Sequence, residues 1–118
     1  MAMTSNVLAE LAATIRSRRL AAADTSYTRQ LLDSGPQKCA KKLGEEAAET
    51  IIAAVAQNPE DLQAEAADLL YHLLVLLESR NVELDDVLET LKNRMGLSGL
   101  DEKAARVSAT PKVGSQTK

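Results

Sequence analysis

The sequence predicts an all-α protein built from helical hairpins. Apolar residues recur three or four positions apart along almost the whole chain, which is the spacing of a helix face. Pro36 and Pro59 each follow a polar turn signal and precede a long periodic segment, as expected of prolines that open helices. We find no strand-like segment and no internal repeat. With 118 residues, the chain has the length of one domain.

The N-terminal part of the chain predicts two helices joined by a connector. Apolar positions within 7–15 define the first helix, with Ser5 or Asn6 as its N-cap. The run 17–25 is polar and alanine-rich and predicts a connector. A short helix follows over about 27–33 and ends at a Ser-Gly-Pro sequence.

The middle of the chain predicts two long helices in an antiparallel hairpin. Pro36 opens the first, which extends to about Gln57, because proline is tolerated where the first N–H has no helical partner. Asn58-Pro59 is a strong stop and restart signal, so a second long helix runs from there to about Arg80.

The C-terminal part predicts one more helix and a tail. The helix spans about 84–97 and ends at Ser98-Gly99. Residues 107–118 are polar and lack periodicity, which predicts a mobile tail. We therefore assign the folded domain to residues 1–106.

Composition excludes several classes of function. A net charge of −3 provides no basic surface for nucleic acid. One cysteine, Cys39, excludes an internal disulfide and fits a reducing cytosol. No apolar run is long enough to span a bilayer, and the N-terminus lacks the apolar core of a signal peptide. We expect a cytoplasmic protein with neither nucleic acid nor membrane as a partner.

The second long helix predicts a homo-oligomer. Over residues 69–77 it is apolar around nearly its whole circumference, and such a helix is buried on all sides. One hairpin cannot cover it, so a second subunit is expected to do so. Two hairpins paired in a homodimer would form a four-helix-bundle core, although the sequence leaves a tetramer open.

Two acidic dyads lie at equal distances from the predicted turn. Glu46 and Glu49 are three residues apart on the first long helix, and Glu65 and Asp68 repeat this spacing on the second. In a hairpin with its midpoint near Gln57, the dyads face each other. Four carboxylates in one layer repel unless a cation lies among them, and Mg²⁺ or Mn²⁺ prefers such oxygens. The pattern predicts a metal site, although acidic pairs on helices are more often simply solvated.

A basic cluster lies one turn before the first dyad: Lys38, Lys41 and Lys42. Lys42 falls on the helix face of Glu46 and Glu49. One interpretation is surface ion pairs along Lys38, Lys42 and Glu46, each worth about 0.2–0.5 kcal/mol. The other is a group of ammonium ions that holds a polyphosphate chain bound to the metals. Three arginines at the start of the connector are a weaker phosphate-binding candidate: Arg16, Arg18 and Arg19.

Two further residues lie near the acidic layer. Gly44 costs about 1 kcal/mol relative to alanine inside a helix, and we favour close approach to Leu70 over a backbone opening for substrate as the explanation. His72 lies one turn beyond Asp68, and we favour a buried structural histidine over a hydrogen-bond partner for a carboxylate.

Several segments match one known pattern: Ser26-Tyr27-Thr28, Leu31-Leu32, Gly35, Lys41–Glu49, Glu65–Leu77, Arg94 and Ser98-Gly99. Together they resemble the phosphoribosyl-ATP pyrophosphohydrolase family, within the wider MazG-like all-α nucleotide pyrophosphatases. The resemblance covers about residues 5–106. Departures, such as Cys39 where an aliphatic residue is common, do not touch the proposed metal ligands.

The resemblance implies the second step of histidine biosynthesis, in which 1-(5-phosphoribosyl)-ATP is hydrolysed to 1-(5-phosphoribosyl)-AMP and pyrophosphate. Four carboxylates would hold Mg²⁺: Glu46, Glu49, Glu65 and Asp68. The metal would activate a water for attack on the α–β phosphoanhydride. Glu45 or Glu49 would take the proton of that water. Lys42, with Lys38 and Lys41, would hold the phosphate chain.

Two alternatives stay open. A housecleaning nucleoside-triphosphate pyrophosphatase would use the same metal layer on other nucleotides. It would differ in the residues that recognise the extra phosphoribosyl group, for which the 16–19 stretch and Arg94 are candidates. A non-catalytic helical dimerisation module would leave the carboxylates solvated, and its melting temperature would not respond to Mg²⁺.

Overall fold

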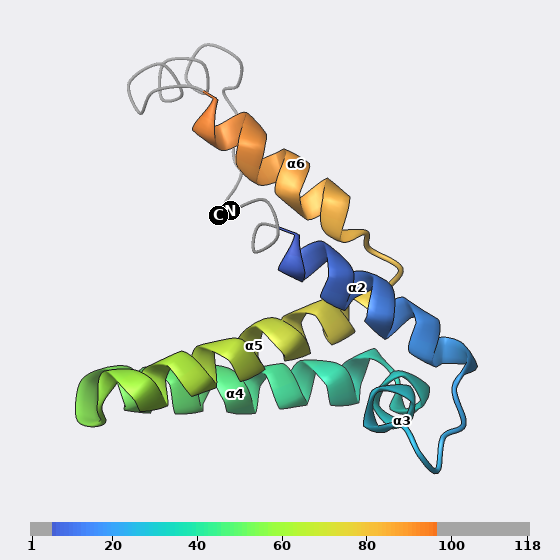
Figure 1. Cartoon of the computed structure of the whole chain (residues 1–118), viewed down its shortest axis with the longest axis horizontal. Helices are drawn as coiled ribbons and strands as arrows, with labels where there is room; N and C mark the ends of the chain where they lie inside the picture. Colours follow the sequence, from blue (N-terminus) through green and yellow to red (C-terminus); the bar gives the residue numbers. More distant parts are fainter. Residues whose placement is uncertain (1–5, 97–118) are drawn as a thin grey trace. The chain divides into compact units, whose positions relative to one another are not determined.

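The structure, a computed structural model, describes residues 6–96 and confirms the all-α class. Over that range the chain forms helices and no β-strand (Figure 1). The elements are α2 (Val7–Ser17), the 3₁₀ turn η1 (Arg18–Leu20), α3 (Tyr27–Ser34), α4 (Pro36–Ala56), α5 (Pro59–Ser79) and α6 (Leu84–Met95). The predicted boundary between domain and tail, and the predicted helix end at Ser98-Gly99, lie outside the described residues.

The chain divides into two units, one ending at Leu84 and the other beginning at Asp85. Helix α6 falls almost wholly in the second unit. Its first turn carries Asp85 and Asp86 and its last turn carries Lys92 and Arg94, so its charges complement the helix dipole at both ends. None of the described helices is long and apolar enough to cross a membrane.

Helices α4 and α5 form the predicted antiparallel hairpin (Figure 1). The Asn58 side chain caps α5 by accepting a 2.8 Å hydrogen bond from the backbone N–H of Asp61, and Pro59 follows at the first helical position. At the other end, Gly35 precedes Pro36 with a φ of +92°, a left-handed conformation that favours glycine. Both helix starts therefore have the local chemistry that the sequence indicates.

The apolar core lies at the open end of the hairpin, away from its turn. Its buried members come from four helices: Ile15, Leu31, Cys39, Leu74 and Val75. The thiol of Cys39 donates a 3.2 Å hydrogen bond to the backbone oxygen of Leu31, which joins α4 to α3. Helices α2 and α3 thus pack over the end of the hairpin that lies opposite its turn (Figure 1).

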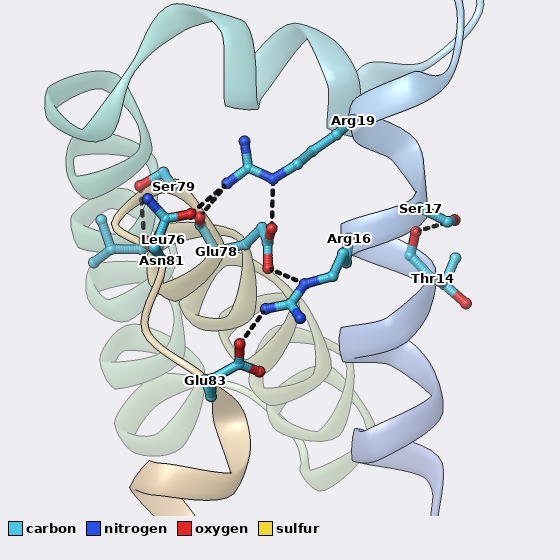
Figure 2. Close-up of polar contacts among 9 residues, drawn as sticks. All are labelled: Thr14, Arg16, Ser17, Arg19, Leu76, Glu78, Ser79, Asn81 and Glu83. Carbon is cyan, nitrogen blue, oxygen red and sulfur yellow. Dashed lines mark hydrogen bonds and ion pairs between the residues drawn. The ribbon is translucent and has the colours of Figure 1, made fainter.

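A buried carboxylate, Glu78 near the end of α5, joins this end of the molecule to α2 and η1 (Figure 2). Its two oxygens accept hydrogen bonds from Nε of Arg16, at 3.3 Å, and from Nε of Arg19. Arg19 also donates to the backbone oxygen of Glu78 at 2.6 Å and to Asn81 at 3.3 Å. Arg16 makes a second ion pair, at 2.8 Å, with Glu83. A buried charge is tolerated when it is paired in this way.

This network corrects the expectation that residues 17–25 are a plain connector. The chain forms a 3₁₀ turn at Arg18–Leu20 before it becomes irregular. The turn directs Arg19 toward the last turn of α5, where its guanidinium meets both a carboxylate and a carbonyl oxygen. The contact is made across 59 residues of sequence, so local periodicity carries no sign of it.

We expect Arg19→Ala to lower the free energy of unfolding by about 1–3 kcal/mol, because it removes a donor from a buried carboxylate. Arg18→Ala is the matched control, since Arg18 is an exposed neighbour in the same turn. It should change stability by less than about 0.5 kcal/mol. Urea unfolding at equal protein concentration measures both. Equal losses in the two variants would contradict the role given to the Glu78 network.

Candidate metal centre

The predicted acidic layer lies between α4 and α5, where the two backbones approach each other closely. Thr50 of α4 lies one turn after Glu46, and its hydroxyl is 2.7 Å from the backbone oxygen of Glu46. The same hydroxyl is 3.2 Å from the backbone oxygen of Glu65 on α5. A hydroxyl has one proton, so it is shared between the two carbonyls. Thr50, which sequence reasoning did not single out, thus links the helices at the level of the acids.

Three carboxylates converge at this level. One oxygen from each of Glu46, Glu49 and Glu65 lies within 4.8 Å of the other two. The Oε1 atoms of Glu46 and Glu65 are inaccessible to solvent and have no hydrogen-bond partner within the described part of the chain. Buried carboxylate oxygens are costly without a donor or a cation. The donor set fits a hard divalent cation, which takes oxygen ligands and keeps positions for water or phosphate oxygens.

The electrostatics of Glu65 also favour a bound cation. Burial raises the pKa of the Glu65 carboxyl above its ordinary value of 4.5, and the nearby charges of Glu49 and Glu46 raise it further. For an acid, a raised pKa means that ionisation is less favourable in the folded than in the unfolded chain. The folded protein therefore loses stability as pH rises from about 4.5 through the raised pKa. A bound cation would offset this loss.

The fourth predicted ligand, Asp68, lies outside this three-carboxylate group. It is exposed on α5, one turn beyond Glu65, and its negative charge contributes to the raised pKa of Glu65. Its role as a ligand stays a prediction.

The predicted lysines stand on α4 before the acidic layer. Lys42 forms a 3.1 Å ion pair with Glu45, three residues on, and not the pair with Glu46 that surface pairing predicts. This contact raises the pKa of Lys42 and lowers the pKa of Glu45. Lys38 and Lys41 are exposed, and their positive charges help to lower the pKa of Glu45. The lysine cluster therefore acts on Glu45, and among its members Lys42 is also affected by the charge of Glu46 in the acidic layer.

The predicted arginines are placed differently. The guanidinium of Arg19 is engaged by Glu78 and Asn81, as described above, which gives it a structural role. Arg18 is exposed, and its charge lowers the pKa of Tyr71 against the larger effect of burial. That either arginine binds substrate stays a prediction.

An aromatic cluster borders the acidic layer. From the sequence, only its histidine has an individual interpretation, whereas its two tyrosines are named as parts of matching segments. His72 is buried as predicted, and its ring packs edge-on against Tyr71, with ring centroids 4.9 Å apart, and against Tyr27. Burial is the main cause of the lowered pKa of His72, while the negative charge of Glu46 acts in the opposite direction. The neutral imidazole is therefore favoured at neutral pH.

The expectation for Gly44 is wrong. A Cβ atom built at Gly44 would meet nothing within 4 Å in the chain, and the residue is exposed. Close approach to Leu70 therefore does not explain this glycine, and nothing else in the structure does.

Known proteins resemble this chain over most of its length. Residues 8–95 match the family described as phosphoribosyl-ATP pyrophosphohydrolase. A phosphoribosyl-ATP pyrophosphatase of Ruegeria sp. (strain TM1040) is 56% identical over 100 residues, which cover 85% of this chain and 95% of that protein. The protein of the same name from Nitrobacter winogradskyi is 57% identical over 97 residues, with coverage of 82% and 84%. The one from Ruegeria pomeroyi is 54% identical over 101 residues, with coverage of 86% and 96%.

We expect Glu65→Gln to raise the melting temperature of the metal-free protein at pH 7, because it removes an unfavourably placed charge. The difference in melting temperature from the unchanged protein should narrow as the pH falls through the raised pKa of Glu65, and it should be smallest well below pH 4.5, where Glu65 is protonated in both the folded and the unfolded chain. Mg²⁺ at about a hundred times its Kd should stabilise the unchanged protein by about 2.7 kcal/mol. The variant should lose most of this response.

Glu89→Gln is the matched control, because Glu89 is exposed on α6 and the substitution makes the same chemical change. It should alter neither the metal-free melting temperature nor the response to Mg²⁺. A full Mg²⁺ response in Glu65→Gln would remove Glu65 from the metal centre.

Proposed function

This chain belongs to the phosphoribosyl-ATP pyrophosphohydrolase family, and on that basis we propose that it catalyses the second step of histidine biosynthesis. It hydrolyses 1-(5-phosphoribosyl)-ATP to 1-(5-phosphoribosyl)-AMP and pyrophosphate. The observation that carries the proposal in the structure is the convergence of three carboxylates with two buried, unpartnered oxygens. Carboxylates alone repel a polyphosphate. A cation held by these carboxylates would offset that repulsion and let the phosphates bind beside them.

Mg²⁺, with Mn²⁺ as the second choice, is the proposed cofactor. Oxygen-only ligands and a small, partly buried cluster suit these ions. The proposed ligands are Glu46, Glu49, Glu65 and Asp68, of which the first three supply the convergent oxygens. When bound, the ion supplies charge neutralisation at the phosphate oxygens and lowers the pKa of a water molecule.

Lys42 is the proposed phosphate-binding residue, with Lys38 and Lys41 in support. Its ammonium group lies one turn before Glu46 on α4 and is already oriented by Glu45, 3.1 Å away. A substrate phosphate offers Lys42 a second anionic partner on the same side of the hairpin. Lys42 would hold the β- and γ-phosphates while the carboxylates hold the ion.

The reaction adds water to the α-phosphorus and breaks its bond to the bridging oxygen, which leaves with pyrophosphate. One proton of the water passes to a carboxylate, for which Glu45 and Glu49 are the candidates. The ion pair with Lys42 lowers the pKa of Glu45, so Glu45 accepts a proton less readily than an unpaired glutamate would. The predicted cytoplasmic location stays a prediction.

We also propose that the protein acts as a homodimer whose hairpins pair in a four-helix core. The turn half of α4 exposes large apolar side chains: Ile51 at 64%, Ile52 at 51% and Val55 at 80%. Leu70 of α5 is 43% exposed, although Leu74 and Val75 are buried within the chain. A second copy would cover this surface, at about 25 cal/mol per Å² of apolar area removed from water. Within residues 69–77 the single chain leaves only Leu70 exposed, so the expectation that one chain cannot cover this segment is wrong for most of it.

We expect Glu46→Gln and Asp68→Asn to abolish Mg²⁺-dependent release of pyrophosphate from phosphoribosyl-ATP while the protein stays folded. Each change keeps the side-chain shape but removes a negative ligand. The unchanged protein should turn over phosphoribosyl-ATP far faster than ATP or dITP, and EDTA should stop the reaction. Faster turnover of ATP or dITP would assign the protein to housecleaning chemistry. Activity retained in either variant would remove that residue from the metal shell.

The double substitution Ile51→Lys with Val55→Lys should convert the homodimer to a monomer, because it places charges in the proposed subunit contact. Sedimentation velocity across a range of concentrations measures this change. Leu20→Lys is the control, since Leu20 is 92% exposed in η1 and lies outside that contact. A monomeric unchanged protein, or a double variant that still dimerises, would place the interface elsewhere.

A further inference from the structure

The side chain of Tyr27 is an exposed aromatic ring beside the proposed site. Tyr27 is the first residue of α3, and 51% of its surface is accessible. Ser26 caps this helix by accepting a hydrogen bond from the backbone N–H of Arg29, so the helix start is fixed. The Tyr27 ring packs nearly perpendicular to His72, with centroids 6.4 Å apart and an interplanar angle of 85°.

Buried groups fix the position of the Tyr27 ring. His72 is only 7% exposed and lies in edge contact with Tyr71 as well as with Tyr27. The Tyr71 hydroxyl is in turn 2.6 Å from the Thr28 hydroxyl, which ties the first turn of α3 to α5. An aromatic side chain held in this way loses little conformational freedom when a ligand binds, which favours binding.

The ring lies next to the layer of proposed phosphate and metal ligands. His72 is one turn beyond Asp68 on α5, and Lys42 is one turn before Glu46 on α4. The charge of Glu46 raises the pKa of His72, and the charge of Lys42 lowers it. The Tyr27 phenol raises the pKa of Lys42. These residues therefore form the next layer of the hairpin from the acids, on the side away from the turn.

Aromatic rings are scarce in this protein. The chain contains two tyrosines, no phenylalanine and no tryptophan. Tyr71 is half-buried, and its hydroxyl is engaged by Thr28, so Tyr27 is the tyrosine whose ring is open to a ligand. A purine base is a flat aromatic system that proteins commonly bind by stacking on such a ring.

We propose that Tyr27 provides the stacking surface for the purine base of the nucleotide, with His72 as the residue that positions its ring. The inference rests on the proposed function, because it takes the acidic layer and Lys42 to hold the phosphates of the same molecule. The base then extends from the α-phosphate toward α3, one layer from the metal centre. Tyr27 is a specificity residue in this arrangement and takes no part in the proton transfer.

The test compares Tyr27→Ala with Tyr27→Phe in steady-state hydrolysis of phosphoribosyl-ATP, with inorganic tripolyphosphate as a competitive inhibitor that lacks a base. We expect Tyr27→Ala to raise KM about tenfold or more, the usual cost of losing a base–aromatic stack. The Ki of tripolyphosphate should stay the same, because its contacts are to metal and lysine. Tyr27→Phe should restore the KM, since the ring is kept and the hydroxyl lost.

Cys39→Ala is the control for a merely structural effect. It removes a buried side chain from the core, so it should lower the melting temperature without a selective change in KM. An unchanged KM in Tyr27→Ala would overturn the proposal, and so would equal weakening of tripolyphosphate. Dissociation of the oligomer at unchanged KM would assign the ring to subunit packing and would also overturn it.

A different result would show that the proposed function, and not the role of Tyr27, is wrong. If the unchanged protein does not hydrolyse phosphoribosyl-ATP, that function is wrong whatever Tyr27 does. Calorimetric binding of ATP and of tripolyphosphate, each with Mg²⁺, then tests the ring alone. Tyr27→Ala should weaken ATP binding and spare tripolyphosphate, and equal effects on the two would reject base stacking.

Discussion

The register of the α4–α5 hairpin is the constraint on which the rest of the structure depends. It brings Glu46 and Glu49 against Glu65, an arrangement that repulsion between the carboxylates opposes. The Asn58 cap fixes where the second helix starts, and the shared hydrogen bond of Thr50 holds the helices together at the level of the acids. A slip of one residue would turn each facing side chain by about 100° around its helix and disperse the cluster.

Stability and chemistry are separated along the hairpin. The open end carries the apolar core and the buried Glu78 with its two arginines. Packing and paired charges therefore stabilise the fold at this end. The middle carries the unpartnered acids, which a metal-free chain holds at a cost. The turn end exposes the apolar side chains of Ile51 and Val55. The proposed cation and the proposed second copy would bind at these two parts of the hairpin.

Much of the fold and part of the site follow from the sequence because their signals are local. Pro36 and Asn58-Pro59 mark helix starts by backbone chemistry. Equal spacing about the turn predicts four facing acids, of which three converge while Asp68 lies outside the group. The contacts of Glu78 and of Tyr27 are different in kind. They join segments distant in the chain, and helical periodicity describes only one helix at a time. The buried glutamate even interrupts the apolar pattern that predicts burial.

The position of Cys39 has a consequence for observing the motions of this molecule. It is the chain's one thiol and is 1% exposed in the core, where α3, α4 and α5 meet. Burial raises its pKa, so even a reagent that reached it would meet little thiolate. Alkylation then requires the open end of the hairpin to separate transiently. The rate of alkylation reports the free energy of that local opening, in a protein that needs no engineered label.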